Sequence, residues 1–248
     1  MNYFLKRAVI VIVGFVAVSA NATPVDLSSW TAEGPGAWSL LSGNTAVRQS
    51  VNTNPSVFYN GADSQGLQLS GEITVQTSGD DDFIGFVLGY SSGDLANSSA
   101  DYMLIDWKQA DQNYSNWGVG LAGLSISHVS GALGPNSGAW SHNPANNVTE
   151  LQRATNLGST GWTDNQTYSF ELVFTSNLIE VYVDNVKEIS LSGSFNNGSF
   201  GFYNFSQSQV LYAGIEEAVA QVPEPSSIAL FGLMLFGLGI SRRRKITS

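Results

Sequence analysis

The stretch Ser78–Tyr90, SGDDDFIGFVLGY, places three adjacent carboxylates directly before an apolar run. The run Phe83–Tyr90 has the length and composition of a buried β-strand. Asp80, Asp81 and Asp82 repel one another at such a position, so either solvent or a cation must offset their charge. Calcium binds roughly six to eight oxygens, and consecutive Asp residues on a turn can converge to supply some of them. The stretch therefore predicts a strand preceded by either a solvated turn or a calcium site with these three ligands.

Other parts of the sequence also show the patterns of short strands. Residues 168–174 and 179–183 alternate apolar and polar side chains, and Asp184-Asn185 between Val183 and Val186 indicates a tight hairpin turn. Helical periodicity is nearly absent between the two ends of the chain. Many short strands separated by Gly, Asn and Ser predict an all-β fold, an antiparallel jelly-roll β-sandwich. The long polar segment 131–147 is expected to be a functional or mobile loop.

The N-terminus reads as a secretory signal peptide over residues 1–22. Lys6 and Arg7 precede an apolar stretch, and Ala20-Asn21-Ala22 fits a small-residue cleavage site. An uncleaved anchor helix is the alternative, but the apolar run is shorter than the roughly 20 residues that span a membrane.

The C-terminus, residues 222–248, forms a second processing segment. Val222, Pro223, Glu224 and Pro225 are followed by the uncharged apolar run 228–240 and then by a basic cluster that includes Arg242, Arg243 and Arg244. A buried core helix is a poor alternative, because these cations could not follow the run into a core. The basic cluster favours a membrane-inserted segment whose end stays cytoplasmic.

This order of motifs resembles the PEP-CTERM sorting signal. The resemblance implies a Gram-negative bacterium and an exosortase-type protease that recognises the VPEP motif at 222–225. It also implies passage through the inner membrane by way of the C-terminal helix. The expected destination is the cell envelope or the exopolysaccharide matrix.

The segment between the two ends, residues 23–221, forms one expected domain with a strongly acidic balance. It holds nineteen acidic and only four basic side chains, a formal charge of −15. Such a surface repels nucleic acid and attracts cations, although an acidic coat also serves solubility alone. The absence of cysteine excludes disulfides, thiolate nucleophiles and thiolate zinc sites.

The acidic run and four later segments are similar to the thrombospondin C-terminal domain, in the same order. These are D-D-D-F-I-G-F-V-L-G-Y at 80–90, D-W-K-Q at 106–109, G-W at 161–162, T-Y at 167–168 and F-G-F-Y-N-F-S-Q at 200–207. The resemblance implies a concanavalin-like, lectin-type sandwich that binds calcium and serves in adhesion. The cysteines and the calcium-binding repeats of that family are missing, and residues 131–156 align poorly.

Further candidates are weaker. Asp101, Asp106 and Asp111 are additional possible calcium ligands, and Asp106 needs a partner because it interrupts an apolar strand. Trp117 and Trp140 lie in polar loops and are candidates for stacking on sugars, whereas Trp107 and Trp162 are expected in the core.

Three functions follow from these features. The first is an exported calcium-binding adhesion module that grips a polysaccharide or a surface protein. The second is a polysaccharide-active hydrolase on the same fold, and the third is a passive matrix protein. Glycoside hydrolases need two carboxylates that face the scissile bond, and the sequence contains no E-x-D-x-E run. Glu180 and Asp184 would point to the same face of a strand, but Tyr182 lies between them and a turn follows. The sequence therefore favours a binding module that is not an enzyme.

Overall fold

The computed structural model describes residues 22–41, 43–134 and 136–220. Apart from Ala22, the expected signal peptide lies outside these residues, as does the sorting segment 222–248. All strands described lie between Thr23 and Val219. Both hydrophobic cores lie within the same limits, so residues 23–221 contain the whole described fold.

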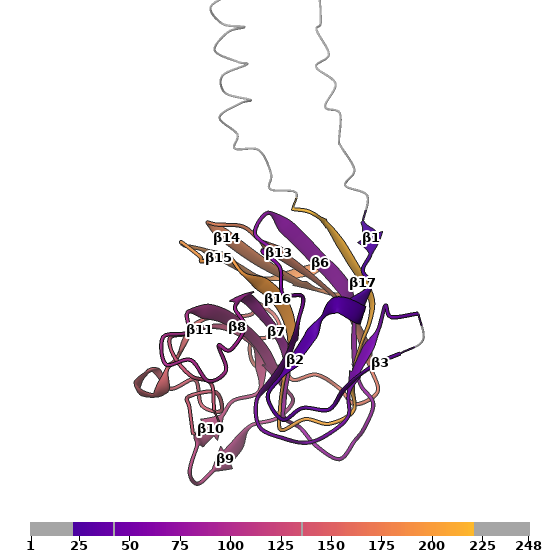
Figure 1. Cartoon of the computed structure of the whole chain (residues 1–248). Coiled ribbons are helices and arrows are strands. Elements are labelled where there is room, and N and C mark those ends of the chain that lie inside the picture. Colours follow the sequence, from indigo (N-terminus) through magenta and orange to yellow (C-terminus); the bar gives the residue numbers. More distant parts are fainter. Residues whose placement is uncertain (1–21, 42, 135, 221–248) are drawn as a thin grey trace, which may run out of the picture.

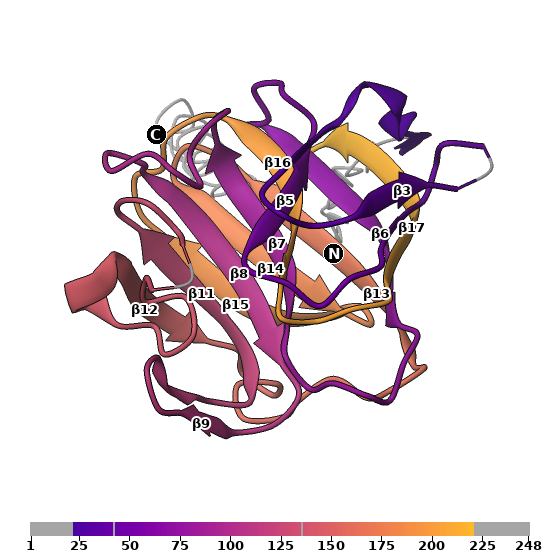
Figure 2. The same ribbon diagram turned by 60° about the horizontal axis from the view of Figure 1, so that its bottom comes forward.

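Two antiparallel sheets form the body of the domain (Figures 1 and 2). Sheet A contains, in spatial order, β15 (Val186–Ser192), β14 (Leu178–Val183), β13 (Thr167–Phe174), β6 (Leu67–Val75), β17 (Val210–Val219), β4 (Val47–Gln49) and β3 (Trp38–Leu40), with β1 (Thr23–Pro24) beside β17. Sheet B contains β12 (Val148–Arg153), β11 (Gly123–Val129), β8 (Tyr102–Lys108), β7 (Phe83–Tyr90), β16 (Ser199–Phe205), β5 (Ser56–Tyr59) and β2 (Thr31–Glu33). This arrangement confirms the expected antiparallel sandwich.

Smaller elements lie outside the two sheets. The strands β9 (Gln112–Tyr114) and β10 (Gly118–Gly120) form a separate hairpin. Two 3-10 turns complete the described elements, η1 (Leu27–Ser29) and η2 (Pro144–Asn146). The predicted hairpin turn between β14 and β15 is confirmed, with φ of 48° at Asp184 and 63° at Asn185. Positive φ at both positions is the geometry of a type I′ turn.

The central strands of sheet B, β8, β7, β16 and β5, are buried on both faces, which explains their continuous apolar sequences, whereas the edge strands β12 and β2 are partly exposed. Side chains alternate between the two faces of a strand. In β8, Met103 and Ile105 belong to the core between the sheets, while Tyr102 and Leu104 belong to a second core. The second core therefore lies on the outer face of sheet B.

Two loops cover this outer face. Leu95 and Ala100 come from the loop after β7, and Leu133, Ala139 and Trp140 come from the long loop after β11. Burial of apolar side chains contributes roughly 25 cal/mol per Å² of apolar surface removed from water, so both loops are part of the stable domain. The polar segment 131–147 thus packs against the outer face of sheet B through a few apolar side chains.

The first and last strands lie side by side. Thr23 pairs with Glu217 and Pro24 with Glu216. The N-terminal start of the described fold therefore lies against its C-terminal strand, and the β9–β10 hairpin lies at the opposite end of the domain (Figure 1).

Two tryptophans stabilise the core as expected. Trp107 and Trp162 are buried, and both belong to the core between the sheets.

In the part of the chain that the structure describes, no helix is long and apolar enough to span a membrane.

Candidate functional site

The three carboxylates of the acidic run converge just before β7. Asp80, Asp81 and Asp82 each offer an oxygen, and these oxygens all lie within 4.8 Å of one another. Two contacts fix the backbone here: the Asp82 amide donates to Gln207 Oε1 at 3.0 Å, and Trp162 Nε1 donates to the Asp82 carbonyl at 3.1 Å. The run is therefore held in place by the core, and Asp82 is only 3% exposed.

Lys108 at the end of β8 provides one internal counter-charge. Its fully buried Nζ donates to Asp82 Oδ1 at 2.7 Å, to the Asp81 carbonyl at 3.0 Å and to Gln112 Oε1 at 2.7 Å. These three bonds use all three ammonium protons. The Phe83 and Trp140 rings flank the ammonium at 5.2 and 4.7 Å from Nζ to the ring centroids. Three carboxylates and one ammonium leave a formal charge of −2.

Asp80 carries the clearest sign of uncompensated charge. Partial burial, followed by the hydrogen bond and negative charge of Asp82, raises the pKa of Asp80 to about 6. The Asn52 side-chain amide donates to Asp80 Oδ2 and opposes this effect. Like charges held together favour either a shared proton or a bound cation. The arrangement is therefore suited to a cation at neutral pH.

A pocket of about 460 Å³ adjoins these carboxylates. It is lined by Asn52, Thr53, Asn54, Asp80, Asp82, Gln112, Tyr114, Trp117, Trp140, Phe205 and Ser206. This volume lies within the range of roughly 300–1,000 Å³ that is common for ligand pockets. We call it the acidic–aromatic pocket.

Aromatic side chains form one wall of the acidic–aromatic pocket. Tyr114 of β9 is 52% exposed and stacks on Trp117, with ring centroids 4.7 Å apart and an interplanar angle of 24°. Trp117 is half-buried, whereas Trp140 is 3% exposed and packs against Phe205. Of the two tryptophans expected to bind sugar, Trp117 offers the more accessible ring. Tyr114 adds a third aromatic ring that the sequence did not single out.

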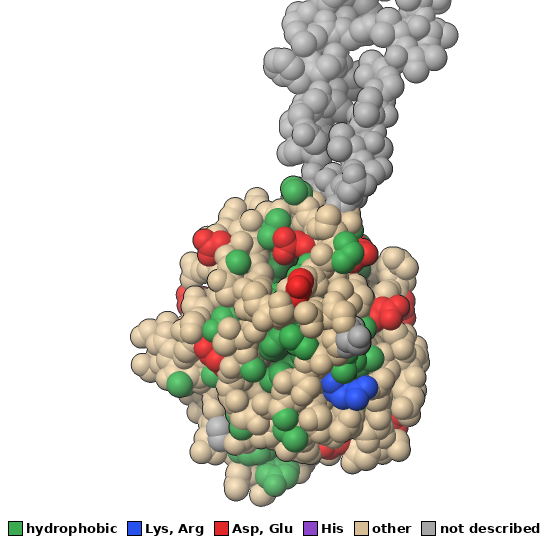
Figure 3. All heavy atoms as spheres, turned by 45° about the vertical axis from the view of Figure 1, so that its right-hand side comes forward, with side chains coloured by type: hydrophobic (Ala, Val, Ile, Leu, Met, Phe, Trp, Pro, Cys, Tyr) green, Lys and Arg blue, Asp and Glu red, His purple; other side chains and the backbone are tan. Residues whose placement is uncertain are grey.

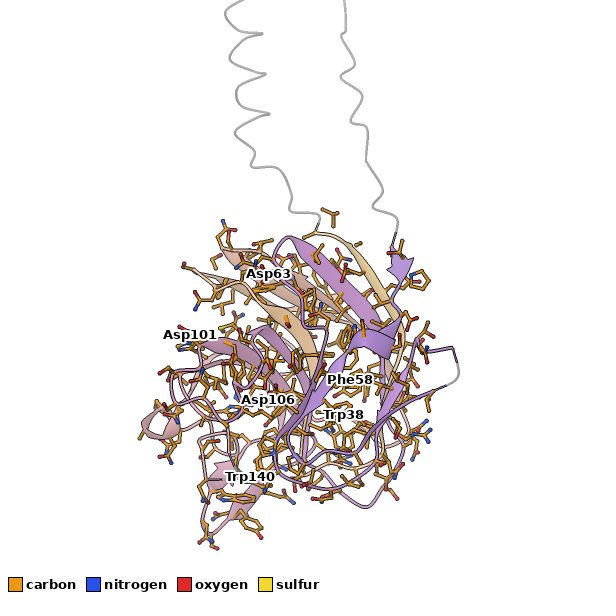
Figure 4. The ribbon with its side chains drawn as sticks, in the orientation of Figure 1. Trp38, Phe58, Asp63, Asp101, Asp106 and Trp140 are labelled. Carbon is orange, nitrogen blue, oxygen red and sulfur yellow. The ribbon has the colours of Figure 1, made fainter. Side chains whose placement is uncertain are left out.

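The three weaker acidic candidates lie apart from the acidic run. Asp101, directly before β8, is hydrogen-bonded to His128 Nε2 at 2.9 Å, on the left of the domain in Figure 4. Asp111 accepts the amide proton of Ala122 at 2.7 Å. Among the described residues, only the acidic run brings three His, Asp or Glu side chains close enough together to hold a metal ion.

Asp106 finds its partner in the long loop after β11. This carboxylate is 1% exposed, and it is bonded to His142 Nε2 at 3.0 Å and to Ser125 Oγ at 3.1 Å. His142 Nδ1 lies 2.9 Å from Glu150 Oε2, and Arg153 in turn binds Glu150. Burial opposes the charged ring, but Asp106 and Glu150 outweigh it and raise the pKa of His142 to about 10. The imidazolium therefore fastens the loop to sheet B.

The carboxylates considered for hydrolysis are engaged elsewhere. Glu180 accepts hydrogen bonds from Lys187, Tyr182 and Ser190. Asp184 lies in the β14–β15 turn and accepts the Ser169 amide proton at 2.9 Å. Both side chains thus stabilise strand geometry in sheet A.

Similar solved structures define the class of fold as a lectin-like sandwich. A carbohydrate-binding module, CBM66 from Bacillus subtilis, aligns with a TM-score of 0.53 at 11% identity over 77% of this chain and 95% of its own. The VIP36 exoplasmic/lumenal domain, bound to Ca²⁺ and Man3GlcNAc, aligns with a TM-score of 0.52 at 14% identity over 81% of this chain and 88% of its own. At these identities the likeness concerns the fold alone.

Residues 34–220 match the Thrombospondin C-terminal region, and the chain belongs to this family. Thrombospondin-2 of Gallus gallus is 27% identical over 199 residues, which cover 72% of this chain and 16% of that protein. Cartilage oligomeric matrix protein of Bos taurus is 24% identical over 208 residues, which cover 72% of this chain and 25% of that protein. The chain thus spans a quarter or less of the length of these relatives.

Residues 221–245 match the PEP-CTERM protein-sorting motif. Both resemblances inferred from the sequence are therefore confirmed, with the motif directly after the folded domain. The motif marks the chain for export and membrane-anchored sorting in a bacterium.

Proposed function

We propose that this protein is an exported adhesion module that holds one calcium ion at the acidic run and binds polysaccharide in the acidic–aromatic pocket. One observation carries the proposal: carboxylates with an uncompensated charge of −2 lie on the edge of a pocket walled by stacked aromatic rings. One divalent ion would bring the formal charge of this group to zero. The calcium-bound lectin domain of the same fold and the thrombospondin relatives support this choice of ion.

Asp80 and Asp81 would be the main calcium ligands. Asp82 already gives Oδ1 to Lys108, which leaves its second oxygen for an ion. Calcium accepts carboxylates, carbonyls and water in flexible geometry, so an incomplete protein shell is compatible with it. The bound ion would offset the repulsion between Asp80 and Asp82 and hold the pocket edge in one arrangement.

The pocket would take a sugar through its aromatic wall and its amides. Tyr114 and Trp117 present ring faces, and Asn52, Asn54 and Gln112 present hydrogen-bonding groups. Sugars combine apolar ring faces with hydroxyl groups, so both kinds of lining side chain have a use. We infer that the protein binds polysaccharide and does not cleave it, in keeping with the carbohydrate-binding module of similar fold and with the thrombospondin relatives.

The sorting motif supplies the expected location. We propose that an exosortase-type protease of a Gram-negative bacterium recognises residues 222–225 while the C-terminal segment holds the chain in the inner membrane. The mature protein would then reside in the envelope or the exopolysaccharide matrix. Because β1 and the end of β17 lie opposite the β9–β10 hairpin, the pocket would face away from the point of attachment (Figure 1).

Binding of residues 23–221 to exopolysaccharide from the source organism tests this proposal. We expect retention in calcium and release by a chelator. Tyr114→Ala should weaken binding about tenfold, equivalent to about 1.4 kcal/mol, because it removes the exposed stacking ring. Tyr182→Ala on sheet A is the matched control and should bind normally. Equal binding with and without calcium, or no binding at all, would contradict the proposal; the second result would favour a passive matrix role.

A further inference from the structure

We infer that the acidic–aromatic pocket selects neutral sugars and excludes anionic ones such as uronates or sulfated sugars. This inference rests on the proposed function and names its ligand class. Among the described residues that line the pocket there is no lysine or arginine. The lining consists of amides, hydroxyls, aromatic rings and two carboxylates, and it therefore contains no cationic side chain that would form an ion pair with an anionic substituent.

The nearest cation is unavailable to a ligand. Lys108 is fully buried, and its three ammonium protons already bind Asp82, the Asp81 carbonyl and Gln112. The Phe83 and Trp140 rings flank the same ammonium. A ligand carboxylate would have to displace a buried ion pair, and breaking such a pair leaves an uncompensated buried charge. Lys108 therefore organises the pocket without serving as an anion-binding residue.

A bound calcium ion does not reverse this preference. The three carboxylates and Lys108 carry −2, so one divalent ion brings the local formal charge to zero and leaves no excess positive charge for an anion. The Asn54 amide can both donate and accept hydrogen bonds, as sugar hydroxyls require. Gln112 Oε1 already accepts from Lys108, and Asn52 already binds Asp80 and Ser206, so these two amides have fewer hydrogen bonds to offer. A neutral sugar therefore satisfies this lining without an ionic partner.

The charges on the rest of the domain also disfavour an anionic ligand. Of its four basic side chains, Lys108, Arg153 and Lys187 are each paired with a carboxylate. Within the described ranges, Arg48 is the one basic side chain that forms no ion pair with a carboxylate. On the face shown in Figure 3, Asp and Glu side chains are scattered widely, whereas Lys and Arg appear at one spot. The field of the domain thus repels a polyanion on approach.

Matched polymers test the inference. Residues 23–221 are tested in calcium at physiological salt against dextran, galactomannan, xylan and exopolysaccharide stripped of its acidic groups. Each polymer is paired with its own carboxymethylated form, so that only the charge differs. We expect at least one neutral polymer to bind and its carboxymethylated form to bind about tenfold more weakly or worse, because the added carboxylates would lie near Asp80 and Asp82 without a cationic partner.

A variant pair separates the pocket from the overall charge. Asn54 is exposed at the pocket edge, and Asn54→Lys adds a cation there. Asn196→Lys adds the same charge at an exposed position on a different cavity, at the other end of β7. Only Asn54→Lys should restore binding of the carboxymethylated form. Equal restoration by both variants would overturn the role assigned to the pocket.

The outcomes for the two proposals differ. Carboxymethylated polymers that bind as well as their neutral forms would overturn the selectivity and leave the proposed function standing. Failure of every polymer, neutral and charged, would remove the proposed function itself and the selectivity with it.

Discussion

Replacing Lys108 with methionine should be among the most destabilising single changes in this domain. The substitution keeps an unbranched side chain one heavy atom shorter but removes the ammonium that binds Asp82 at 2.7 Å. Asp82 is 3% exposed, so its carboxylate would be left buried without a counter-charge. Breaking a buried ion pair from one side costs about 3–5 kcal/mol.

Chemical denaturation of residues 23–221 at pH 7 in chelator measures this effect. For a domain of this size the loss corresponds to roughly 6–20 °C in melting temperature. Lys187→Met is the matched control: its ammonium pairs with Glu180, but the Lys187 side chain is 45% exposed, so about 1 kcal/mol or less is expected. The double variant Lys108→Met with Asp82→Asn should recover much of the loss, since it removes the orphaned charge.

A loss of less than about 1 kcal/mol for Lys108→Met would refute the reasoning, because it would match an exposed pair rather than a buried one. A double variant as unstable as the single variant would also count against it. That result would show that the packing of Lys108, not its charge, stabilises the acidic run.

Three further predictions concern other parts of the chain. His142 should contribute its full stabilisation below pH 6.5, the ordinary pKa of histidine, and lose it as pH rises through about 10, its pKa in the folded domain. His142→Gln should remove this decline, which denaturation between pH 7 and 10 measures. In chelator, protonated Asp80 favours the folded domain, so this contribution to stability is full below pH 3.8 and is lost as pH rises through about 6. Calcium affinity should correspondingly fall as pH drops below about 6. Asp80→Asn should abolish both effects. Deleting residues 222–248 should release the protein from the envelope into the medium, and unchanged retention in cell fractions would count against the sorting role.

Much of the fold could be predicted because strand periodicity is a local property. Residues 168–174 and 179–183 alternate clearly, and the structure places β13 and β14 over them. The three-residue strands β2, β3 and β4 carry too few positions for a pattern. The apolar run Phe83–Tyr90 indicates a buried strand, but such a run does not say which loops will cover the outer face of the sheet.

The candidate site was predictable only in its local part. The sequence shows three adjacent carboxylates, and it shows that Asp106 needs a partner. It does not show that His142, 36 residues away, supplies that partner. Lys108 and Tyr114 also went unrecognised, because their roles depend on where the ends of β8 and β9 meet the acidic run. Pairings of this kind are set by tertiary packing.

A calcium titration of residues 23–221 followed by thermal melting tests the central claim most directly. The account predicts a saturable rise in melting temperature with calcium, a weaker response to magnesium, and reversal by chelator. The Asp80→Asn, Asp81→Asn double variant should show no rise. An unchanged melting temperature in calcium, or an equal rise in this variant, would contradict a calcium site at the acidic run.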